Sequence, residues 1–293
     1  MAHQILVAGA TGALGREVIQ QLSYHNLKVL TRSRERALSL LPDSVQIHEG
    51  DALKPESLSG LCDGVDVVIS CLGASVGMQD RERRSYLKVD TPANLRLIEL
   101  AKAAGVQRFV YVSLWIQPGY AQNGYVQAHQ QVEAALAQSG LDYSIVRPTG
   151  LFSAMLEFLR MAEMGAGMLP GGGSSRSNPV HQADVADVIV GLLDSGASEI
   201  GVGGPEVFSR RQILDLAFNA LERKPRYVSM PAGVMGAMGS LIGLFDGRTG
   251  DLMRFFSQVA SVDCIAPRIG KRQLGDYFKQ AVADSRSTGE RAG

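Results

Sequence analysis

The sequence predicts an α/β protein built on a parallel sheet that helices cover on both faces. Apolar runs alternate with helical patterns from residue 4 to residue 204, which is typical of repeated strand–helix–strand units. The run VDVVISCLG (65–73) is almost continuously apolar, as expected for a strand with helices on both sides. The sequence shows no repeat with a period of about 20 to 50 residues, so a solenoid is not expected.

The expected strands and helices follow from local patterns. Strands are predicted at 4–10, 27–33, 45–51, 65–73, 107–115, 142–148 and 199–204. Helices are predicted at 15–25, 91–105, 124–139 and 183–195. The first helix places Val18, Ile19 and Leu22 on one face. Thr91 and Pro92 are typical of a helix start, because the first turn does not need the amide hydrogen that proline lacks.

The remaining sequence predicts a small cap. We expect one sheet domain at 1–150, continued by 180–204, and a cap at 151–179 and 205–293. The segment PGGGSSRSN (170–178) predicts a flexible loop or lid. One stretch carries Phe152, Met155, Phe158, Met161, Met164 and Met168. These side chains line an apolar pocket, since Met adapts to irregular shapes, or form the ordinary packing of a cap helix.

Composition and charge exclude several function classes. Lys plus Arg number 29, as do Asp plus Glu, so nothing favours nucleic acid or an acidic membrane surface. The three cysteines, Cys62, Cys71 and Cys264, have no metal-type spacing and fit a reducing compartment. The first strand starts too early to leave room for a signal peptide. The longest apolar stretch, 231–245, is shorter than a span of ~20 residues. We therefore expect a soluble, cytoplasmic protein. The stretch 231–245 suggests an apolar partner or a membrane surface, and its lack of Lys and Arg argues against a basic interfacial helix.

A glycine-rich turn joins the first strand to the first helix. In LVAGATGALG (6–15) the glycines are Gly9, Gly12 and Gly15. Helix N-termini bind phosphate through unpaired amide groups and the helix dipole. Gly9 permits the tight turn, Gly12 the close approach of phosphate, and Gly15 the packing of helix on strand. We predict a Rossmann-type dinucleotide site whose pyrophosphate is contacted by Gly9, Thr11, Gly12, Ala13, Leu14 and Gly15. The alternative is a turn that binds nothing.

The second strand ends where such sites select their cofactor. An acidic residue there binds the ribose hydroxyl of NAD, whereas a cation suits the 2′-phosphate of NADP. Arg32 occupies this position in VLTRSRER, and Arg34 and Arg36 follow. Guanidinium groups bind phosphate through a planar fork of donors, so we predict NADP rather than NAD, with Arg34 and Arg36 as solvated helix residues.

Further contacts are expected where other strands end. Asp51 and Ala52 follow the third strand and are placed against the adenine. Cys71, Leu72 and Gly73 follow the fourth and leave room for the cofactor to pass. Pro148 and Thr149 end the sixth strand, at the edge where doubly wound sheets bind ligands, and are expected to touch the nicotinamide. Neighbouring Arg147 is expected to be structural.

These motifs together resemble the short-chain dehydrogenase/reductase superfamily, and more narrowly its atypical, NmrA-like NAD(P)H-binding branch. The matching segments are GATGALG (9–15), LTRSRER (30–36), EGDALKPESL (49–58), VDTPANLRLIELAKAAGVQRFVYVSL (89–114), SGLDYSIVRPTGLF (139–152) and VHQADVADVIVGLL (180–193). The tail segment 259–278 is similar to C-terminal segments of that branch, with less specificity. The resemblance implies a Rossmann fold, a nicotinamide cofactor and hydride transfer, and a monomer or a homodimer.

The resemblance also implies catalytic positions. Active members use a Ser, with a Tyr and a Lys spaced as YxxxK on one helix. Ser113 matches the Ser and Tyr125 the Tyr, but His129 stands where the Lys belongs, four residues after Tyr125. A His is mostly neutral at pH 7, so it cannot hold a constant positive charge beside Tyr125, although it can bond a ribose hydroxyl. Asp90 stands where the family has a catalytic Asn.

Two functions remain open at this stage. The first is an NADP(H)-dependent oxidoreductase acting on an unidentified small, apolar carbonyl or enone-like substrate, with Tyr125 as proton donor and His129 as its partner. The second is a non-catalytic NADP(H) sensor or assembly scaffold, in which Tyr125 and His129 are ordinary helix residues. His181 is assigned no chemistry, because a lone His before a helix is more often structural.

Overall fold

The computed structural model describes residues 2–73, 85–117, 120, 123–193 and 199–290. A sheet of seven parallel strands runs through its centre in the order β3-β2-β1-β4-β5-β6-β9. These strands are β1 (Gln4–Ala8), β2 (Asn26–Thr31), β3 (Gln46–Glu49), β4 (Val67–Ser70), β5 (Arg108–Val112), β6 (Asp142–Pro148) and β9 (Glu199–Val202). Each overlaps a strand expected from the sequence. The order changes direction between β1 and β4, and ligands bind at such a switch point in open α/β sheets.

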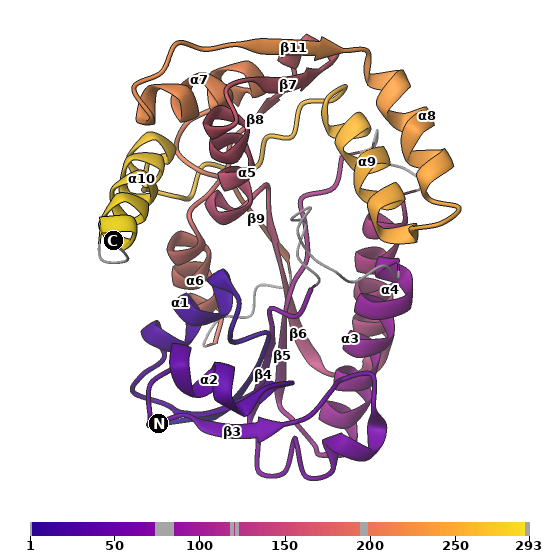
Figure 1. The fold of residues 1–293 in the computed structure, drawn as a ribbon. Helices are drawn as coiled ribbons and strands as arrows, with labels where there is room; N and C mark the ends of the chain where they lie inside the picture. The colour runs from indigo at the N-terminus through magenta and orange to yellow at the C-terminus, as the bar shows by residue number, and fades with distance from the viewer. Residues whose placement is uncertain (1, 74–84, 118–119, 121–122, 194–198, 291–293) are drawn as a thin grey trace.

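Helices cover both faces of this sheet (Figure 1). One face packs against α1 (Ala13–Gln21), α2 (Arg34–Leu40) and α6 (Gln182–Gly191), and the other against α3 (Tyr86–Ala103) and α4 (Gly124–Ser139). Along β1, Ile5 and Val7 enter the first core while Leu6 and Ala8 enter the second. This alternation of fully buried side chains confirms the predicted doubly covered sheet.

The start of α3 differs from the expectation. The helix begins at Tyr86 rather than Thr91, so Pro92 lies inside it. Proline donates no hydrogen bond, and the helix loses one backbone bond at this point. The earlier turn nevertheless buries Tyr86, which is 1% exposed and packs its ring 4.7 Å from that of Tyr125. We attribute the longer helix to this buried aromatic contact, which outweighs the local preference of Pro92.

The remaining described elements lie outside the main sheet and the helices that cover it. They are η1 (Pro55–Leu58), on the sheet side, and then α5 (Phe152–Glu163), β7 (Gly167–Pro170), η3 (Gly171–Gly173), β8 (Arg176–Ser177), β10 (Phe208–Ser209), α7 (Arg210–Ala220), β11 (Tyr227–Met230), α8 (Ala232–Ile242), α9 (Gly247–Val259) and α10 (Leu274–Glu290). The tail is mostly helical, as expected. Helices α5, α7 and α10 share an apolar core, and Figure 1 shows α8 and α9 beside the upper end of α4.

Most side chains of the Met- and Phe-rich stretch belong to ordinary helix packing, the second of the two expectations. Phe152 and Met155 are 1% and 9% exposed and belong to the core shared with α7 and α10. Phe158 and Met161 pack against the same core. Met164 is 79% exposed, so the described structure gives no pocket lined by the whole set.

The prediction of a flexible loop at 170–178 is wrong. Gly171, Gly172 and Gly173 have φ angles of 60°, 74° and 73°, so these glycines serve a left-handed backbone conformation rather than flexibility. Asn178 is fully buried and donates from Nδ2 to the carbonyls of Gly204 (3.2 Å) and Ala266 (2.9 Å). Glycine content alone did not distinguish a required conformation from a mobile one.

The apolar stretch 231–245 forms α8 and the turn after it. Helix α8 packs along α9, but Leu241, Leu244 and Phe245 are 67%, 76% and 90% exposed. An apolar partner for this surface stays a prediction. Among the described residues, no helix is both long enough and apolar enough to cross a membrane.

Candidate functional site

The glycine turn is fixed by contacts between backbone atoms. Gly9 has a φ of 80°, and a Cβ on it would lie 2.6 Å from the carbonyl oxygen of Cys71. The amide of Gly12 donates to the Gly9 carbonyl at 3.0 Å, which closes the turn. A Cβ on Gly15 would lie 2.3 Å from the same Gly9 oxygen. The conformation expected of Gly9 and the close packing expected of Gly15 are therefore both present.

The N-terminus of α1 is open beside this turn. Gly12 is its N-cap residue and is exposed, so no side chain caps the helix, and its first turn carries no acidic residue. A Cβ on Gly12 would meet only the Gly9 oxygen, at 3.3 Å. The first amides of α1, starting with Ala13 and Leu14, stand at the positive end of the helix dipole. This arrangement suits a phosphate group that approaches the backbone closely.

The arginines after β2 differ in their hydrogen bonds and ion pairs. Arg32 is exposed directly beyond the strand and has no hydrogen bond or ion pair within the described part of the chain. Arg34 donates from Nη2 to the carbonyl of Ile47 at 3.0 Å, and its Nε lies 3.9 Å from Glu49. Arg32, which lies nearest the strand end, is thus available to a ligand at this edge, as is the exposed Arg36, whereas Arg34 is engaged by β3.

The other expected cofactor contacts lie at the ends of their strands. Asp51 accepts a bond from the amide of Leu53 at 3.0 Å, which folds the loop after β3, and Ala52 beside it is 7% exposed. Cys71 and Leu72 are partly exposed beyond β4, and Gly73 is exposed. Pro148 is buried, and the Thr149 hydroxyl donates to the carbonyl of Asn178 at 2.6 Å.

Asn94 is a residue of this region that sequence reasoning missed. It is fully buried on α3 and accepts a bond from the Ser70 hydroxyl at 2.6 Å. Its Nδ2 donates to the carbonyls of Leu72 (3.1 Å) and Asp90 (2.9 Å). It therefore ties the loop after β4 to the helix behind it. The available signal was an amide among the inward-facing residues of this helix, where Asp90 and Thr91 are also buried.

The structure brings Tyr125 and His129 together on α4. The ring centroid of Tyr125 lies 5.0 Å from that of His129 and 5.1 Å from that of Phe255 on α9. Ser113 is 5% exposed at the end of β5, and its hydroxyl has no hydrogen-bond partner among the described residues. Asn123 caps α4 and also donates from Nδ2 to the carbonyl of Asp251 at 2.7 Å. The tail helix α9 thus covers Tyr125, which the sequence did not indicate.

Burial decides the protonation of this pair. His129 is 6% exposed, and its Nδ1 lies 2.8 Å from the hydroxyl of Tyr111. Burial lowers the pKa of His129 to about 3, so the ring is neutral at pH 7. Burial raises the pKa of Tyr125 above its usual range, and the Asp90 carboxylate raises it further. Tyr125 is therefore a protonated phenol at pH 7 and a weaker acid than an unperturbed tyrosine.

Two other residues have structural roles, as the sequence suggested. His181 accepts the amide hydrogen of Ala183 at Nδ1 (3.0 Å) and so caps α6. Arg147 pairs with Glu133 at 2.8 Å and with Glu199 at 2.6 Å. Neither side chain is available for chemistry in this arrangement.

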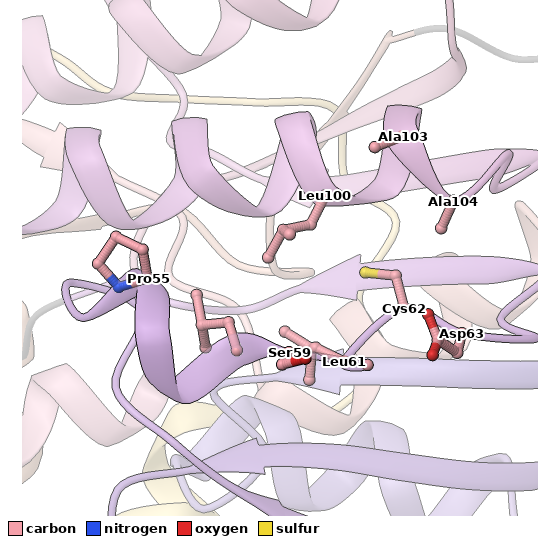
Figure 2. Close-up of a pocket in the computed structure, with 10 residues that line it drawn as sticks. Pro55, Ser59, Leu61, Cys62, Asp63, Leu100, Ala103 and Ala104 are labelled. Carbon is pink, nitrogen blue, oxygen red and sulfur yellow. The ribbon is translucent and has the colours of Figure 1, made fainter.

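A separate hollow lies between η1, the loop after it and the end of α3 (Figure 2). Its volume is about 250 Å³, and Leu58, Cys62, Leu100 and Ala104 are among the residues that line it. Cys62 precedes β4 and Ala104 precedes β5, so the hollow belongs to the amino ends of the strands. The glycine turn lies at the carboxyl ends, and the hollow is not part of that site.

Comparison with known proteins gives a family match and distant relatives. Residues 9–196 match the family described as NAD(P)H-binding. NADH dehydrogenase (ubiquinone) 1 alpha subcomplex subunit 9, mitochondrial, from Arabidopsis thaliana is 28% identical over 80% of this chain and 62% of its own length. Divinyl chlorophyllide a 8-vinyl-reductase, chloroplastic, from Cucumis sativus is 23% identical over 96% of this chain and 76% of its own length. This chain thus spans less than two thirds of the first relative.

A solved structure supports the fold. NADPH-dependent quinone oxidoreductase QOR2 from Escherichia coli, in complex with NADPH, aligns with a TM-score of 0.71 at 18% identity, over 95% of this chain and 99% of that chain. Both curated relatives are named as organellar proteins, so the expected cytoplasmic location stays a prediction.

The neutral His129 predicts a pH dependence of stability. Its pKa is lower in the folded chain than in the unfolded chain, so the unfolded chain binds the extra proton first. The free energy of unfolding should then fall as pH drops from about 6.5 toward 3, by up to about 1.4 kcal/mol per pH unit from this residue. Urea unfolding of wild type and His129→Phe across this range measures it. Burial also lowers the pKa of His181, but both proteins keep that residue. Equal slopes would contradict a neutral, buried His129.

Proposed function

This chain belongs to the NAD(P)H-binding family, and from that premise we propose that it is an NADP(H)-dependent oxidoreductase of the atypical short-chain dehydrogenase/reductase type. The observation that carries the proposal is the uncapped N-terminus of α1 above a turn closed by Gly9, Gly12 and Gly15. That space lies at the switch point between β1 and β4, and no side chain of the described residues lies within 4 Å of a Cβ placed on Gly12. A pyrophosphate fits it through backbone amides.

The cofactor is placed by the same strand ends. In this proposal Arg32 binds the 2′-phosphate, because it is exposed and free of other partners in the described part of the chain. Asp51 and Ala52 lie against the adenine, and Cys71, Leu72 and Gly73 border the path of the cofactor. Pro148 and Thr149 meet the nicotinamide. Thr149 does so with its backbone or methyl group, because its hydroxyl hydrogen is given to Asn178.

The chemistry is assigned to the protonated Tyr125. When bound, the nicotinamide supplies a hydride. Tyr125 then donates its phenolic proton to the oxygen of a carbonyl or enone-like acceptor. The buried Ser113 hydroxyl is free to hold that oxygen in place. His129 positions the ring of Tyr125 by contact and is itself fixed by Tyr111; being neutral, it does not lower the pKa of Tyr125 as a lysine would.

The substrate enters from the side of the cap. We assign residues 1–150 and 180–204 to the cofactor-binding part and 151–179 and 205–293 to the cap. Phe255 of α9 and Tyr86 of α3 contact the Tyr125 ring, so an apolar body is expected next to the reacting carbonyl. The proposed substrate is therefore a small, apolar carbonyl or enone-like molecule.

Arg32 should set the preference between cofactors. Arg32→Ala removes one charge-assisted contact to the 2′-phosphate, so NADPH should bind about 10- to 100-fold more weakly while NADH changes little. Titration calorimetry with both coenzymes measures this. Arg34→Ala is the matched control, since Arg34 is engaged by Ile47 and Glu49. An equal loss for both coenzymes would refute the role of Arg32.

Tyr125 should control turnover without controlling cofactor affinity. Tyr125→Phe removes the donated proton, so NADPH oxidation with quinones, aldehydes or enones should fall about 10²- to 10⁴-fold, with the Kd for NADPH unchanged. Tyr24→Phe is the control, because Tyr24 is 66% exposed beyond α1.

The opposite result is equally clear. If wild type binds NADPH tightly without oxidising it on any acceptor of the panel, and Tyr125→Phe behaves alike, the oxidoreductase proposal fails. The non-catalytic sensor or scaffold would then replace it.

A further inference from the structure

A second set of polar groups lies in the cap, where three short segments run side by side. Strand β8 pairs antiparallel with β10, with Ser177 opposite Phe208 and Arg176 opposite Ser209. The Arg210 amide continues this pairing by donating to the Ser175 carbonyl at 3.1 Å. On the other side of β8, Ser177 bridges Cys264, and the Cys264 amide donates to the Arg176 carbonyl at 2.7 Å.

This small sheet has an outer and an inner face, because side chains alternate along a strand. Arg176 and Asp263 occupy the outer face, where they pair at 2.7 Å and are 60% and 41% exposed. Ser175 and Ser177 flank Arg176 and therefore point to the inner face. Arg210 stands opposite Ser175, and opposite residues of an antiparallel pair share a face. The inner face thus presents two hydroxyls and a guanidinium.

The donors of the inner face are buried and unused. Ser175 and Ser177 are 7% and 3% exposed. Their hydroxyls and the Nε of Arg210 have no hydrogen-bond partner in the part of the chain that the structure describes. The hydroxyl of Tyr120, 1% exposed, lies against the thiol of Cys264 in the same cluster. Folded proteins satisfy the great majority of buried polar groups, so the unpartnered donors of Ser175, Ser177 and Arg210 together form a candidate ligand site.

The charge on this face is unbalanced. Arg210 has no ion pair among the described residues, and the acidic groups that act on it are Tyr120, Cys264 and Asp263. Burial raises the pKa of both Tyr120 and Cys264, so both are neutral at pH 7. Asp263 is already paired with Arg176 on the outer face. Arg210 is half-buried and its Nε is shielded from solvent, so its charge is partly dehydrated without a counter-charge, and an anion supplied by a ligand would compensate it.

The inner face adjoins the proposed reaction site. The Cys264 thiol lies 3.7 Å from the carbonyl of Trp115, two residues after Ser113. On the other side, Phe255 contacts the rings of both Tyr120 (5.9 Å) and Tyr125 (5.1 Å). A small molecule held against Tyr125 therefore has these donors within its neighbourhood.

We propose that Ser175, Ser177 and Arg210 bind an oxyanion, a carboxylate or a phosphate, carried by the substrate. Guanidinium and hydroxyl donors together match the lone pairs of such a group. The substrate then has an apolar body with the reacting carbonyl and an acidic group that the cap recognises. That the anion belongs to the substrate rests on the proposed function; that the face binds an oxyanion does not.

The test uses simple anions and needs no turnover. The Tm of the full chain is measured against sodium phosphate and sodium acetate, with sodium chloride at equal ionic strength as reference. Wild type should be stabilised by at least one oxyanion, and Arg210→Met should weaken that binding about tenfold or more. Without oxyanion, Arg210→Met should be about as stable as wild type, because it removes a half-buried charge that has no ion pair among the described residues. Stabilisation by phosphate alone would identify a phosphate site, whereas stabilisation by acetate as well would show that the face also accepts a carboxylate.

Two further variants control the result. Arg211→Met changes the next residue, an exposed arginine stacked on Tyr227, and should keep the full response. The double variant Ser175→Ala and Ser177→Ala should weaken the response and covers the case in which Arg210→Met does not fold. Since the glycine turn is a second place for phosphate, the measured quantity is the part of the response that the cap variants remove.

The proposal is overturned if neither oxyanion stabilises wild type more than chloride, or if Arg210→Met and the double serine variant leave the response intact. It is also overturned if Arg210→Met destabilises the ligand-free chain while the response persists. A response that disappears in these variants supports the site even if Tyr125→Phe leaves turnover unchanged, and in that case only the assigned chemistry fails.

Discussion

The proposed cofactor site depends on one close backbone contact, in which the start of α1 packs against the turn that follows β1. Gly15 packs against the carbonyl of Gly9, and Gly9 packs against the carbonyl of Cys71 beyond β4. A Cβ on either glycine would clash with that carbonyl. These contacts fix the direction of α1 and leave its first amides uncapped. The site proposed for a negatively charged cofactor is therefore a consequence of how strand and helix meet, and in that proposal the side chain of Arg32 adds the selectivity.

Buried aromatic contacts set the chemistry at the other end of the site. A lysine four residues after Tyr125 would lower the pKa of the phenol, whereas the neutral His129 leaves it protonated. The phenol is therefore protonated at pH 7, as a proton donor in a reduction must be, but it is a weaker acid than the phenol of a Tyr–Lys pair. The cap contributes Phe255 against Tyr125 and, through Arg210, a half-buried positive charge. Substrate recognition is thus assigned to segments that lie far from the cofactor motifs in the sequence.

The sequence predicted those features that depend on local patterns. Helix α4 and strand β6 begin and end where the periodicity and Pro148 indicate, and the glycine turn has the expected conformation. The errors arose where tertiary contacts overrule local preference. Pro92 lies inside α3 because Tyr86 is buried by packing, and 170–178 is ordered because Asn178 bonds to segments far along the chain.

Within the site, the residues that the sequence could not find are those whose role depends on distant partners. Asn94 is an ordinary helix residue until Ser70 and Leu72 are placed beside it. In the sequence, Arg210 is simply the residue after the Ser209 cap of α7. Its missing counter-charge becomes visible only in the structure, where the nearby Asp263 is paired with Arg176.

The central claim is that the first backbone amides of α1, at Ala13 and Leu14, hold the pyrophosphate close to Gly12, and calorimetric titration of Gly12→Ala with NADPH tests it most directly. Among the described residues, the added Cβ meets only the Gly9 oxygen, at 3.3 Å, so the variant should fold with nearly unchanged Tm. The account predicts that wild type binds NADPH and that the variant binds it at least tenfold more weakly, because the methyl group occupies the path of the phosphate. Equal affinity in both proteins, or no heat from wild type with either nicotinamide coenzyme, would contradict it.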